Sequence, residues 1–275
     1  MRLSLSVRVA ESFSNKRVGA IPLQELAPLA RNAGYEALCM RASVCGVQHD
    51  RDEVATVRAH ATAHDLAISM VTADFDVPEN KEAGPRSLRD ITPSLDLAEA
   101  LGSDLIRVCL KTEEDIKEAA SAADEAAERG IRLAHQSHTR SLFETVEGSV
   151  ETLKRIDRKN FGIIYEPANL AICGQTYGAE TLRAFEPYLF NVYLQNHVPE
   201  HNGDLVMNTW TLGDVPSRHY PLDSGQGIDF DAVFGGLHDI GYDGWVTLHH
   251  AFAGQLPPDE AARASADFLK QFTSG

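Results

Sequence analysis

The 275-residue sequence has few basic residues for its length, and this shortage excludes one class of partner. It contains 25 Lys and Arg against 40 Asp and Glu, which gives a formal net charge of -15. Such an excess of negative charge repels the phosphate backbone of DNA or RNA. The sequence therefore predicts a protein without a nucleic-acid partner.

Signals for disulfides, export and membrane insertion are also lacking. The four cysteines show no CxxC spacing, and three of them lie in apolar runs, where Cys behaves as a small buried hydrophobe. No run approaches the ~18 consecutive apolar residues of a transmembrane helix. Arg2 and Arg8 interrupt the N-terminal stretch MRLSLSVRV, which is unlike a secretory signal. We expect a cytoplasmic protein with no membrane partner.

A glycine-rich phosphate loop is absent from residues 10–20, the segment that follows the first apolar run. This absence argues against a doubly wound open sheet, the main alternative for a chain of alternating strands and helices. The apolar runs predict eight strands, at 2–9, 35–40, 66–72, 104–110, 131–136, 161–165, 189–195 and 245–249.

The segments between these strands are amphipathic and have helix start and stop signals. Pro22 precedes one helix that Gly34 ends, and Thr112 with three acidic residues begins another that Gly130 ends. The predicted helices lie at 22–34, 51–65, 92–102, 112–130, 141–157, 178–187, 229–240 and 258–272. Strictly alternating strands and helices predict a (β/α)8 TIM barrel that forms a single domain over residues 1–275.

One connection is unusually long. Residues 196–228 separate the seventh strand from its helix, and loops of this length are usually functional or disordered. The segment contains His197, Trp210, Arg218, His219 and Tyr220. Because aromatic and imidazole side chains argue against disorder, we interpret it as a lid over the active site or as a contact with a second subunit.

Polar side chains occur where the predicted strands end. In a TIM barrel the carboxyl ends of the strands surround the active site, so these residues should converge there. They are Arg41, Asp74, Lys111, Gln136, His138, Glu166, Gln195, Asn196, His197, His249 and His250. A single strand-end charge is usually only solvated, as we expect for Lys111 and His250, but such a series indicates a common site.

Several of these segments resemble signatures of the xylose isomerase-like TIM barrels. The motifs are GYEALCMR, LAEALGSDLIRV, GIRLAHQSH, IYEPANL, GQGIDF and GYDGWVTLHH, and the resemblance extends from about residue 3 to residue 250. That superfamily includes sugar phosphate isomerases and epimerases, hydroxypyruvate isomerase and endonuclease IV. The resemblance implies a divalent metal at the barrel mouth, which chelates a hydroxy-carbonyl substrate while a base moves a proton.

The ligands that the resemblance implies differ from the usual set. Gln136 stands where the family has a Glu, Glu166 where it has an Asp, and His249 where it has a second Glu. Tyr193 occupies the position of a His or Gln, with Gln195 or His197 as alternatives if the register differs. This set of one carboxylate with amide and imidazole ligands favours Mn²⁺, Zn²⁺, Fe²⁺ or Co²⁺ over Mg²⁺.

Gln136 cannot accept a proton at neutral pH, so a mechanism with two glutamates is unavailable. We predict that His138, Glu166 and His249 are catalytic, with Gln136, Glu166 and His249 as metal ligands. By strand alternation His135 points away from the site and is structural. The predicted substrate-binding residues are Arg41, Gln195, Asn196, His197 and Arg218.

Three functional hypotheses follow. The first is a metal-dependent isomerase or epimerase that acts on a small sugar, sugar derivative or keto-acid by proton abstraction next to a carbonyl. The second is a lyase or decarboxylase on a related sugar, cyclitol or keto-acid, for which one base suffices. The third is a binding subunit without a metal, for which the loss of the usual glutamates is the best support. A homo-oligomer is compatible with all three.

Overall fold

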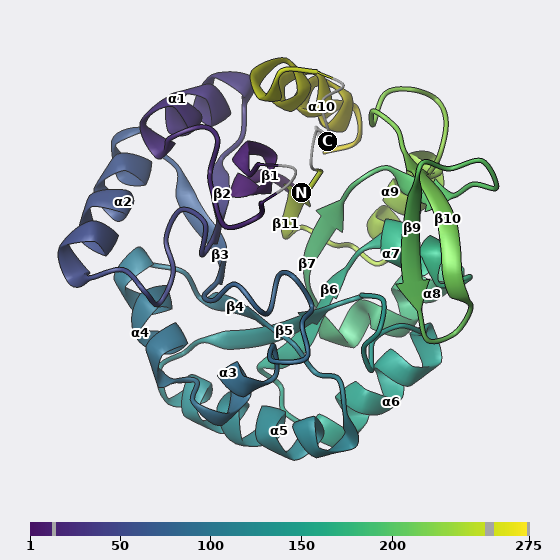
Figure 1. Cartoon of the computed structure of the whole chain (residues 1–275), viewed down its shortest axis with the longest axis horizontal. Coiled ribbons are helices and arrows are strands. Elements are labelled where there is room, and N and C mark those ends of the chain that lie inside the picture. Colours follow the sequence, from purple (N-terminus) through teal and green to yellow (C-terminus); the bar gives the residue numbers. More distant parts are fainter. Residues whose placement is uncertain (13–14, 251–255, 274–275) are drawn as a thin grey trace.

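The computed structural model describes residues 1–12, 15–250 and 256–273. Eight parallel strands close into a barrel in the order β1-β11-β7-β6-β5-β4-β3-β2, and the helices form an outer ring around it (Figure 1). The barrel strands are β1 (Arg2–Ser6), β2 (Ala37–Arg41), β3 (Ala67–Thr72), β4 (Leu105–Val108), β5 (Arg132–Gln136), β6 (Phe161–Tyr165), β7 (Leu189–Leu194) and β11 (Trp245–Leu248). The predicted TIM barrel is confirmed.

The larger helices lie where the sequence predicts them. They are α1 (Leu23–Ala33), α2 (Arg51–Ala63), α4 (Thr92–Leu101), α5 (Glu113–Glu128), α6 (Val146–Ile156), α8 (Ala179–Phe185), α9 (Phe230–Asp239) and α10 (Pro258–Thr273). The sequence analysis did not predict the short helices α3 (Arg86–Arg89) and α7 (Pro167–Ile172), or the 3-10 helices η1 (Val7–Ala10) and η2 (Glu186–Tyr188). Helix η1 takes up the end of the first predicted strand.

Local sequence explains where the helices begin and end. The Asp50 side chain accepts hydrogen bonds at the start of α2 while Glu53 accepts one from the backbone of Asp50, and Thr112 and Asp115 form the same capping box in α5. Gly34 ends α1 with a φ of 99°, a left-handed conformation that disfavours residues with a Cβ. These signals fix the helix boundaries independently of packing.

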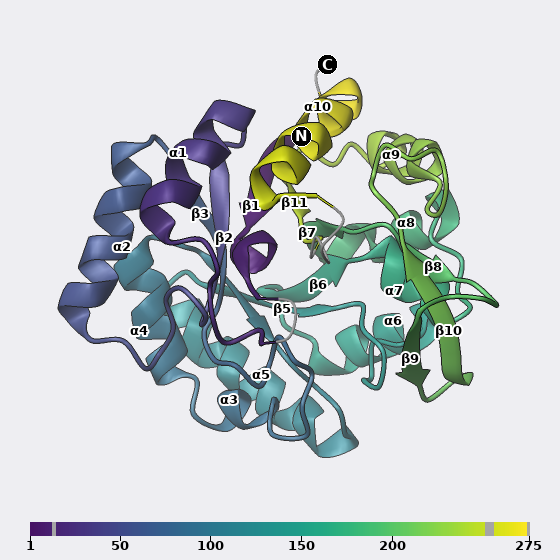
Figure 2. The same cartoon turned by 45° about the horizontal axis from the view of Figure 1, so that its top comes forward.

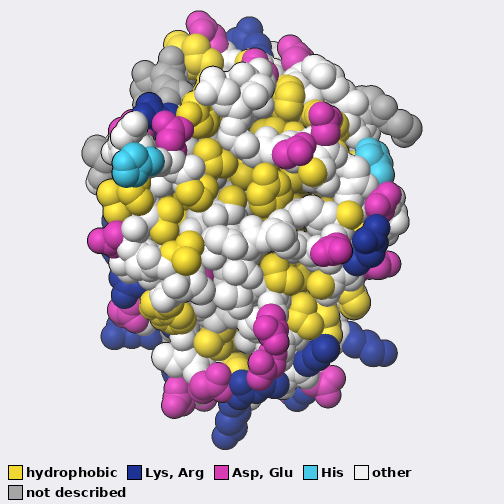
Figure 3. Space-filling model, turned by 90° about the vertical axis from the view of Figure 1, so that its right-hand side faces the viewer, with side chains coloured by type: hydrophobic (Ala, Val, Ile, Leu, Met, Phe, Trp, Pro, Cys, Tyr) yellow, Lys and Arg dark blue, Asp and Glu magenta, His cyan; other side chains and the backbone are white. Residues whose placement is uncertain are grey.

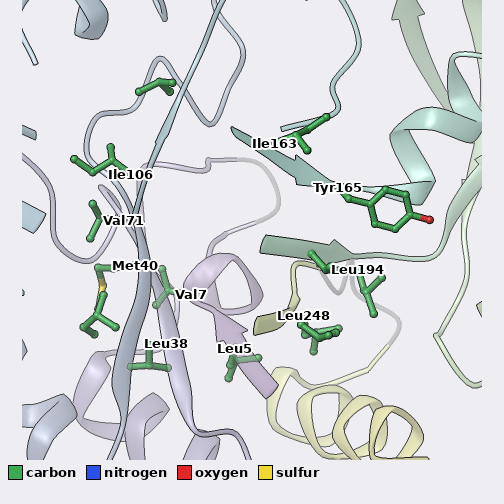
Figure 4. Packing of buried hydrophobic residues seen from close by; sticks show 14 of the residues in the cluster. Leu5, Val7, Leu38, Met40, Val71, Ile106, Ile163, Tyr165, Leu194 and Leu248 are labelled. Carbon is green, nitrogen blue, oxygen red and sulfur yellow. The ribbon is translucent and has the colours of Figure 1, made fainter. Parts of the chain in front are cut away.

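Two layers of apolar side chains hold the barrel together. The larger lies between strands and helices, and Figure 4 shows part of it, including Leu38, Ile106 and Leu248. The smaller fills the inside of the barrel with residues that alternate with the first set: Cys39, Met70, Leu105, Ala134, Ile164 and Tyr193. Because the barrel is filled below, a ligand can enter only at its mouth.

The long connection is not an irregular loop, as the sequence analysis treated it. It forms an antiparallel sheet of β8 (His197–Pro199), β10 (Gly213–His219) and β9 (Leu205–Thr209) beside the barrel mouth (Figure 2). Gly213, with a φ of 71°, follows the turn between β9 and β10. A glycine after a short run of alternating residues is a hairpin signal that the sequence analysis did not use.

The face that carries this sheet is apolar in its middle and charged around its edges (Figure 3). Val206, Trp210 and Leu212 of the hairpin are 65%, 51% and 58% exposed. The Trp210 ring is therefore not buried over the barrel mouth. The predicted subunit contact stays a prediction. All four cysteines are free and buried. Among the described residues, no helix has the length and apolar character needed to cross a bilayer.

Gly162→Ala tests the close approach of β6 to Tyr188 and Phe190, around the start of β7. A Cβ at Gly162 would lie 2.6 Å from the ring of Phe190 and closer still to the carbonyl oxygen of Tyr188. We expect the free energy of unfolding, measured in urea, to fall by about 1–3 kcal/mol. Gly235→Ala is the control, because this exposed α9 position has open space around it and alanine favours a helix there. Equal stability of the two variants would contradict this account.

Candidate active site

A cavity of about 480 Å³ lies at the carboxyl ends of the barrel strands, beside the three-stranded sheet. This volume suits a small-molecule ligand. The residues that line it are Arg8, Lys16, Arg41, Pro78, Glu79, Asn80, Arg107, Gln136, His138, Thr139, Arg140, Asn169, Gln195, His197, Leu205, Val206, Met207, Asn208, His219 and His249. Residues from both termini and from the middle of the chain therefore meet here.

Most residues that the sequence analysis assigned to the site line this cavity. They are Arg41, Gln136, His138, Gln195, His197 and His249. Asn196 and Arg218 are not among the described lining residues. The Asn196 amide donates to the carbonyl oxygens of Pro221 and Gln226, so it holds the turn before α9. Arg218 pairs with Glu200 at 2.7 Å in the outer sheet, and nothing there supports its predicted contact with substrate.

Glu166 lies directly behind the cavity wall and is fully buried. The Gln195 amide donates to its Oε1, and the Asn169 amide donates to its Oε2 at 3.1 Å. Burial raises the pKa of this carboxyl to about 8, although the hydrogen bond from Gln195 and the charge of Arg107 lower it. A carboxyl with this pKa populates both protonation states near neutral pH and can give or take a proton.

His138 has a defined tautomer. Its Nδ1 lies 3.0 Å from the carbonyl oxygen of Thr139, which can only accept, so Nδ1 carries the proton and Nε2 has a free lone pair. Burial lowers the pKa of this imidazole to about 3, so it is neutral at pH 7. His135 instead stacks on Phe143 with ring centroids 4.2 Å apart, which agrees with its predicted structural role outside the barrel.

His249 and Tyr193 stack inside the barrel with ring centroids 4.0 Å apart. The Nδ1 of His249 lies 3.0 Å from the Ser6 hydroxyl, and the Tyr193 hydroxyl lies 3.1 Å from the Cys39 sulfur. Burial and then the charges of Arg41 and Arg107 lower the pKa of His249 well below its ordinary value. Its imidazole is therefore neutral and surrounded by positive charge.

Glu11 forms ion pairs with two of the cavity arginines, and the sequence analysis did not single it out. Arg41 donates to both of its carboxylate oxygens, at 2.6 and 3.1 Å, and Arg8 donates to one of them at 3.1 Å. The Ser43 hydroxyl donates to the same carboxylate at 2.7 Å. This buried network fixes Arg8 and Arg41 at the edge of the cavity, and the predicted role of Arg41 in holding an anion stays a prediction.

Arg107 is the site residue that the sequence analysis overlooked. It is on β4, is only 4% exposed and lines the cavity. Its Nε has no hydrogen-bond partner among the described residues. An arginine between the apolar residues of LIRVCL was the available signal, because alternation points its side chain into the barrel together with Leu105.

The lining of the cavity is cationic although the whole chain is acidic. Five lining residues are basic, and one, Glu79, is acidic; the basic residues are Arg8, Lys16, Arg41, Arg107 and Arg140. The net charge of the chain is -15, so this concentration of positive charge is not a consequence of composition. A cleft with one sign of charge favours ligands of the opposite sign, here a carboxylate or phosphate.

The outer sheet is attached to the cavity by histidines and by one glutamate. His197 of β8 stacks on His219 of β10 at 3.9 Å, and both rings lie at the cavity. The carboxylate of Glu144 accepts from the backbone N–H groups of Trp210 and Thr211 and also from that of Arg140, all at 2.8–3.0 Å. The hairpin is thereby connected to the loop that follows His138.

The donor set around the cavity does not fit a divalent cation. Of the predicted ligands, Glu166 is fully buried with both oxygens held by amide hydrogens, and the charges of Arg41, Arg107, Arg8 and Lys16 act on His249 and oppose a cation beside it. Gln136 Oε1 is buried without a described partner, but an amide oxygen alone is a weak ligand. Within the described ranges, no three His, Cys, Asp or Glu side chains are grouped to hold a metal ion.

A closed barrel of eight parallel strands with a polar cavity at their carboxyl ends is the architecture of the TIM-barrel enzymes. The chain belongs to the family of xylose isomerase-like TIM barrels, whose model matches residues 27–272. A comparison with curated protein sequences found no significant match. The family resemblance of the sequence motifs is therefore confirmed.

Solved structures share the fold at low sequence identity. A xylose isomerase domain protein from Planctomyces limnophilus is 16% identical, with a TM-score of 0.73 over 100% of this chain and 98% of its own. A probable 3-DHS dehydratase from Bacillus anthracis is 15% identical, with a TM-score of 0.72 over 98% of this chain and 99% of its own. The IOLI protein, solved with a zinc atom, is 17% identical, with a TM-score of 0.71 over 100% of this chain and 98% of its own.

The histidine stack predicts a stability loss in mild acid. Burial lowers the pKa of His197 from 6.5 to about 3 and that of His219 from 6.5 to about 4. Between pH 6.5 and 4 the unfolded chain binds protons that the folded chain does not, so stability falls as the pH falls, by up to ~1.4 kcal/mol per pH unit for each histidine. The measurement is urea unfolding at pH 7 and pH 5.

The matched variant is His197→Asn with His219→Asn. It should lose less stability than the wild type between these two pH values, because the carboxylates that also titrate are the same in both proteins. An identical pH dependence would show that the two imidazoles do not accept protons on unfolding.

Proposed function

We propose that this protein is an isomerase or epimerase that moves a proton next to a carbonyl group in a small anionic sugar derivative or keto-acid. The observation that carries the proposal is a cavity lined by two neutral imidazoles, His138 and His249, with one buried carboxyl, Glu166, directly behind its wall. Acid/base catalysis requires groups of this kind within reach of one substrate.

The roles of these groups follow from their hydrogen bonds. Glu166 is oriented by Gln195 and Asn169 and has a pKa of about 8, so it is suited to give or take the proton. His138 offers Nε2 as an acceptor, because its Nδ1 proton is bonded to Thr139. Gln136 Oε1, which has no described partner, is placed to accept a hydrogen bond from a substrate hydroxyl.

The charge of the cavity supports an anionic substrate. Carboxylate or phosphate groups match the cationic lining, and a keto-acid or sugar phosphate carries such a group next to or near the reacting carbonyl. The proposal includes no metal step, because the predicted ligands Gln136, Glu166 and His249 do not form a divalent-cation site. It therefore departs from the metal-dependent activity that the family resemblance implies.

Elimination is the second candidate. A lyase also begins with proton removal next to a carbonyl, and Glu166, the buried carboxyl behind the cavity wall, suffices as its base. A probable 3-DHS dehydratase has the same fold, which supports elimination as a candidate reaction. Similarity at 15% identity extends to the fold alone. Incubation with keto-acids and sugar phosphates in deuterated water separates the two: isomerisation keeps every substrate oxygen, and elimination releases water.

Glu166→Gln tests the proposed acid/base group. We expect the rate of solvent-deuterium incorporation into the reactive compound of this panel to fall about 100- to 10,000-fold, because the amide cannot transfer the proton. Glu180→Gln, the same change at an exposed position of α8, is the control and should leave the rate unchanged. NMR measures both rates. If Glu166→Gln exchanges deuterium as fast as the wild type, another group moves the proton.

If the wild type exchanges no proton of any keto-acid or sugar phosphate in the panel, the enzymatic proposal is wrong. A protein that binds these compounds without exchange would be the binding subunit of the third hypothesis.

A further inference from the structure

Arg107 is a buried cation whose charge is not neutralised by an ion pair. Its side chain is on the inner side of β4, and the residue is 4% exposed. No carboxylate of the described residues lies within 4.0 Å of its guanidinium, and its Nε has no described hydrogen-bond partner. A buried cation without an ion pair is costly, and the Tyr193 ring, 6.0 Å from the guanidinium carbon, offsets only part of that cost, so Arg107 indicates a bound anion.

The neighbouring arginines show the contrast. Arg8 and Arg41 share the carboxylate of Glu11, with distances of 2.6–3.1 Å between guanidinium nitrogens and carboxylate oxygens. Both arginines therefore form ion pairs within the protein. Arg107 lines the same cavity without such a partner. Of these three buried arginines, it is therefore the one without a carboxylate partner among the described residues.

The position of Arg107 matters as much as its charge. Strand β4 pairs with β5, which carries Gln136, and the guanidinium carbon lies 6.0 Å from the centre of the Tyr193 ring. Its charge also acts on Glu166, Tyr193 and His249. Glu166, Tyr193, His249 and Gln136 occupy the positions where the family resemblance places the metal ligands. The guanidinium thus lines the same cavity as Gln136 and His249 and lies beside Tyr193.

We propose that the guanidinium of Arg107 takes the place of the divalent cation in this barrel and holds an anionic oxygen of the substrate. This inference rests on the proposed function only for the identity of that oxygen, the enolate or carboxylate oxygen next to the reacting carbon. A guanidinium is always charged and offers several N–H donors in one plane, which suits two adjacent oxygens. It also repels a divalent metal from the same space.

The replacement is consistent with the altered ligands. A metal ion needs anionic or neutral ligands whose lone pairs point at it. A guanidinium needs hydrogen-bond acceptors, and a nearby protein carboxylate would form an ion pair with it and compete with a bound anion. Gln136 in place of a glutamate removes one such carboxylate. The hydrogen bonds from Gln195 and Asn169 hold the Glu166 carboxyl in place without a metal.

Binding measurements on the full chain test the replacement without requiring activity. The protein is treated with EDTA, dialysed, and titrated calorimetrically with Mn²⁺ alone and with oxalate alone, a planar dianion with adjacent oxygens like those of an enediolate. We expect the wild type to bind oxalate without metal and not to bind Mn²⁺. Arg107→Met should weaken oxalate binding about 10- to 100-fold, the loss expected for hydrogen bonds to a charged group.

Two further variants make the result specific. Arg140→Met removes another cation of the cavity lining, whose side chain is 47% exposed, and it should weaken oxalate binding less than Arg107→Met does. Arg107→Met combined with Gln136→Glu removes the guanidinium and restores the glutamate that the family resemblance implies. This double variant should bind Mn²⁺ more tightly than the wild type.

Either of two results overturns the replacement: the wild type binds Mn²⁺ at one ion per chain, or Arg107→Met binds oxalate as tightly as the wild type does. If Arg107→Met does not fold, the wild-type titrations still decide, since failure of the metal-free wild type to bind oxalate contradicts the inference. Loss of proton exchange with intact oxalate binding would instead concern the proposed function alone.

Discussion

The positive charge of Arg107, enclosed inside the barrel on β4, constrains the chemistry of the whole site. In a low-dielectric interior a cation acts strongly on every ionisable neighbour. It lowers the pKa of Glu166 against the larger effect of burial, and it disfavours protonation of His138 and His249. Burial is the largest cause in each case: it keeps the imidazoles neutral, an effect to which the cation adds, and it raises the pKa of the carboxyl, an effect that the cation opposes. Acid and base groups coexist here because burial and the fixed cation together set their protonation states.

This arrangement depends on a difference between the cavity arginines: Arg8 and Arg41 have a carboxylate partner, and Arg107 has none among the described residues. Glu11 lies at the end of η1, outside the barrel strands, and its carboxylate binds Arg8 and Arg41 together. That network stabilises the cavity wall and leaves Arg107 without a carboxylate partner in the part of the chain that the structure describes. The proposed preference for an anionic ligand thus depends on the position of this single acid.

The barrel could be predicted from the sequence because each element carries its own signal. The run FGIIY matches β6 residue by residue, and capping residues such as Thr112 fixed the helix starts. The hairpin of β9 and β10 was not predicted, because its strands are short, partly exposed and interrupted by Pro216. The pairing itself is local, with Gly213 opposite Thr209, and the glycine at this turn was a signal that the sequence analysis did not use.

The site was predicted only in part, for a related reason. Gln136, His138 and His249 could be found because they follow strands, where a barrel collects polar groups. Arg107 lies within a strand, and Arg8 lies in a segment that becomes a 3-10 helix, so neither met that rule. The family resemblance directed attention to metal ligands, whereas the cationic character of the cavity emerges only when residues from many strands are brought together.

The carboxylate of Glu144 joins two parts of the cavity wall that are far apart in sequence. It binds the backbone of the hairpin tip at Trp210 and Thr211 and also that of Arg140, two residues after His138. Hinge motion of the outer sheet must therefore either break these charged hydrogen bonds or pull the His138 loop with it. Any displacement of the hairpin would thus be coupled to the position of the His138 imidazole.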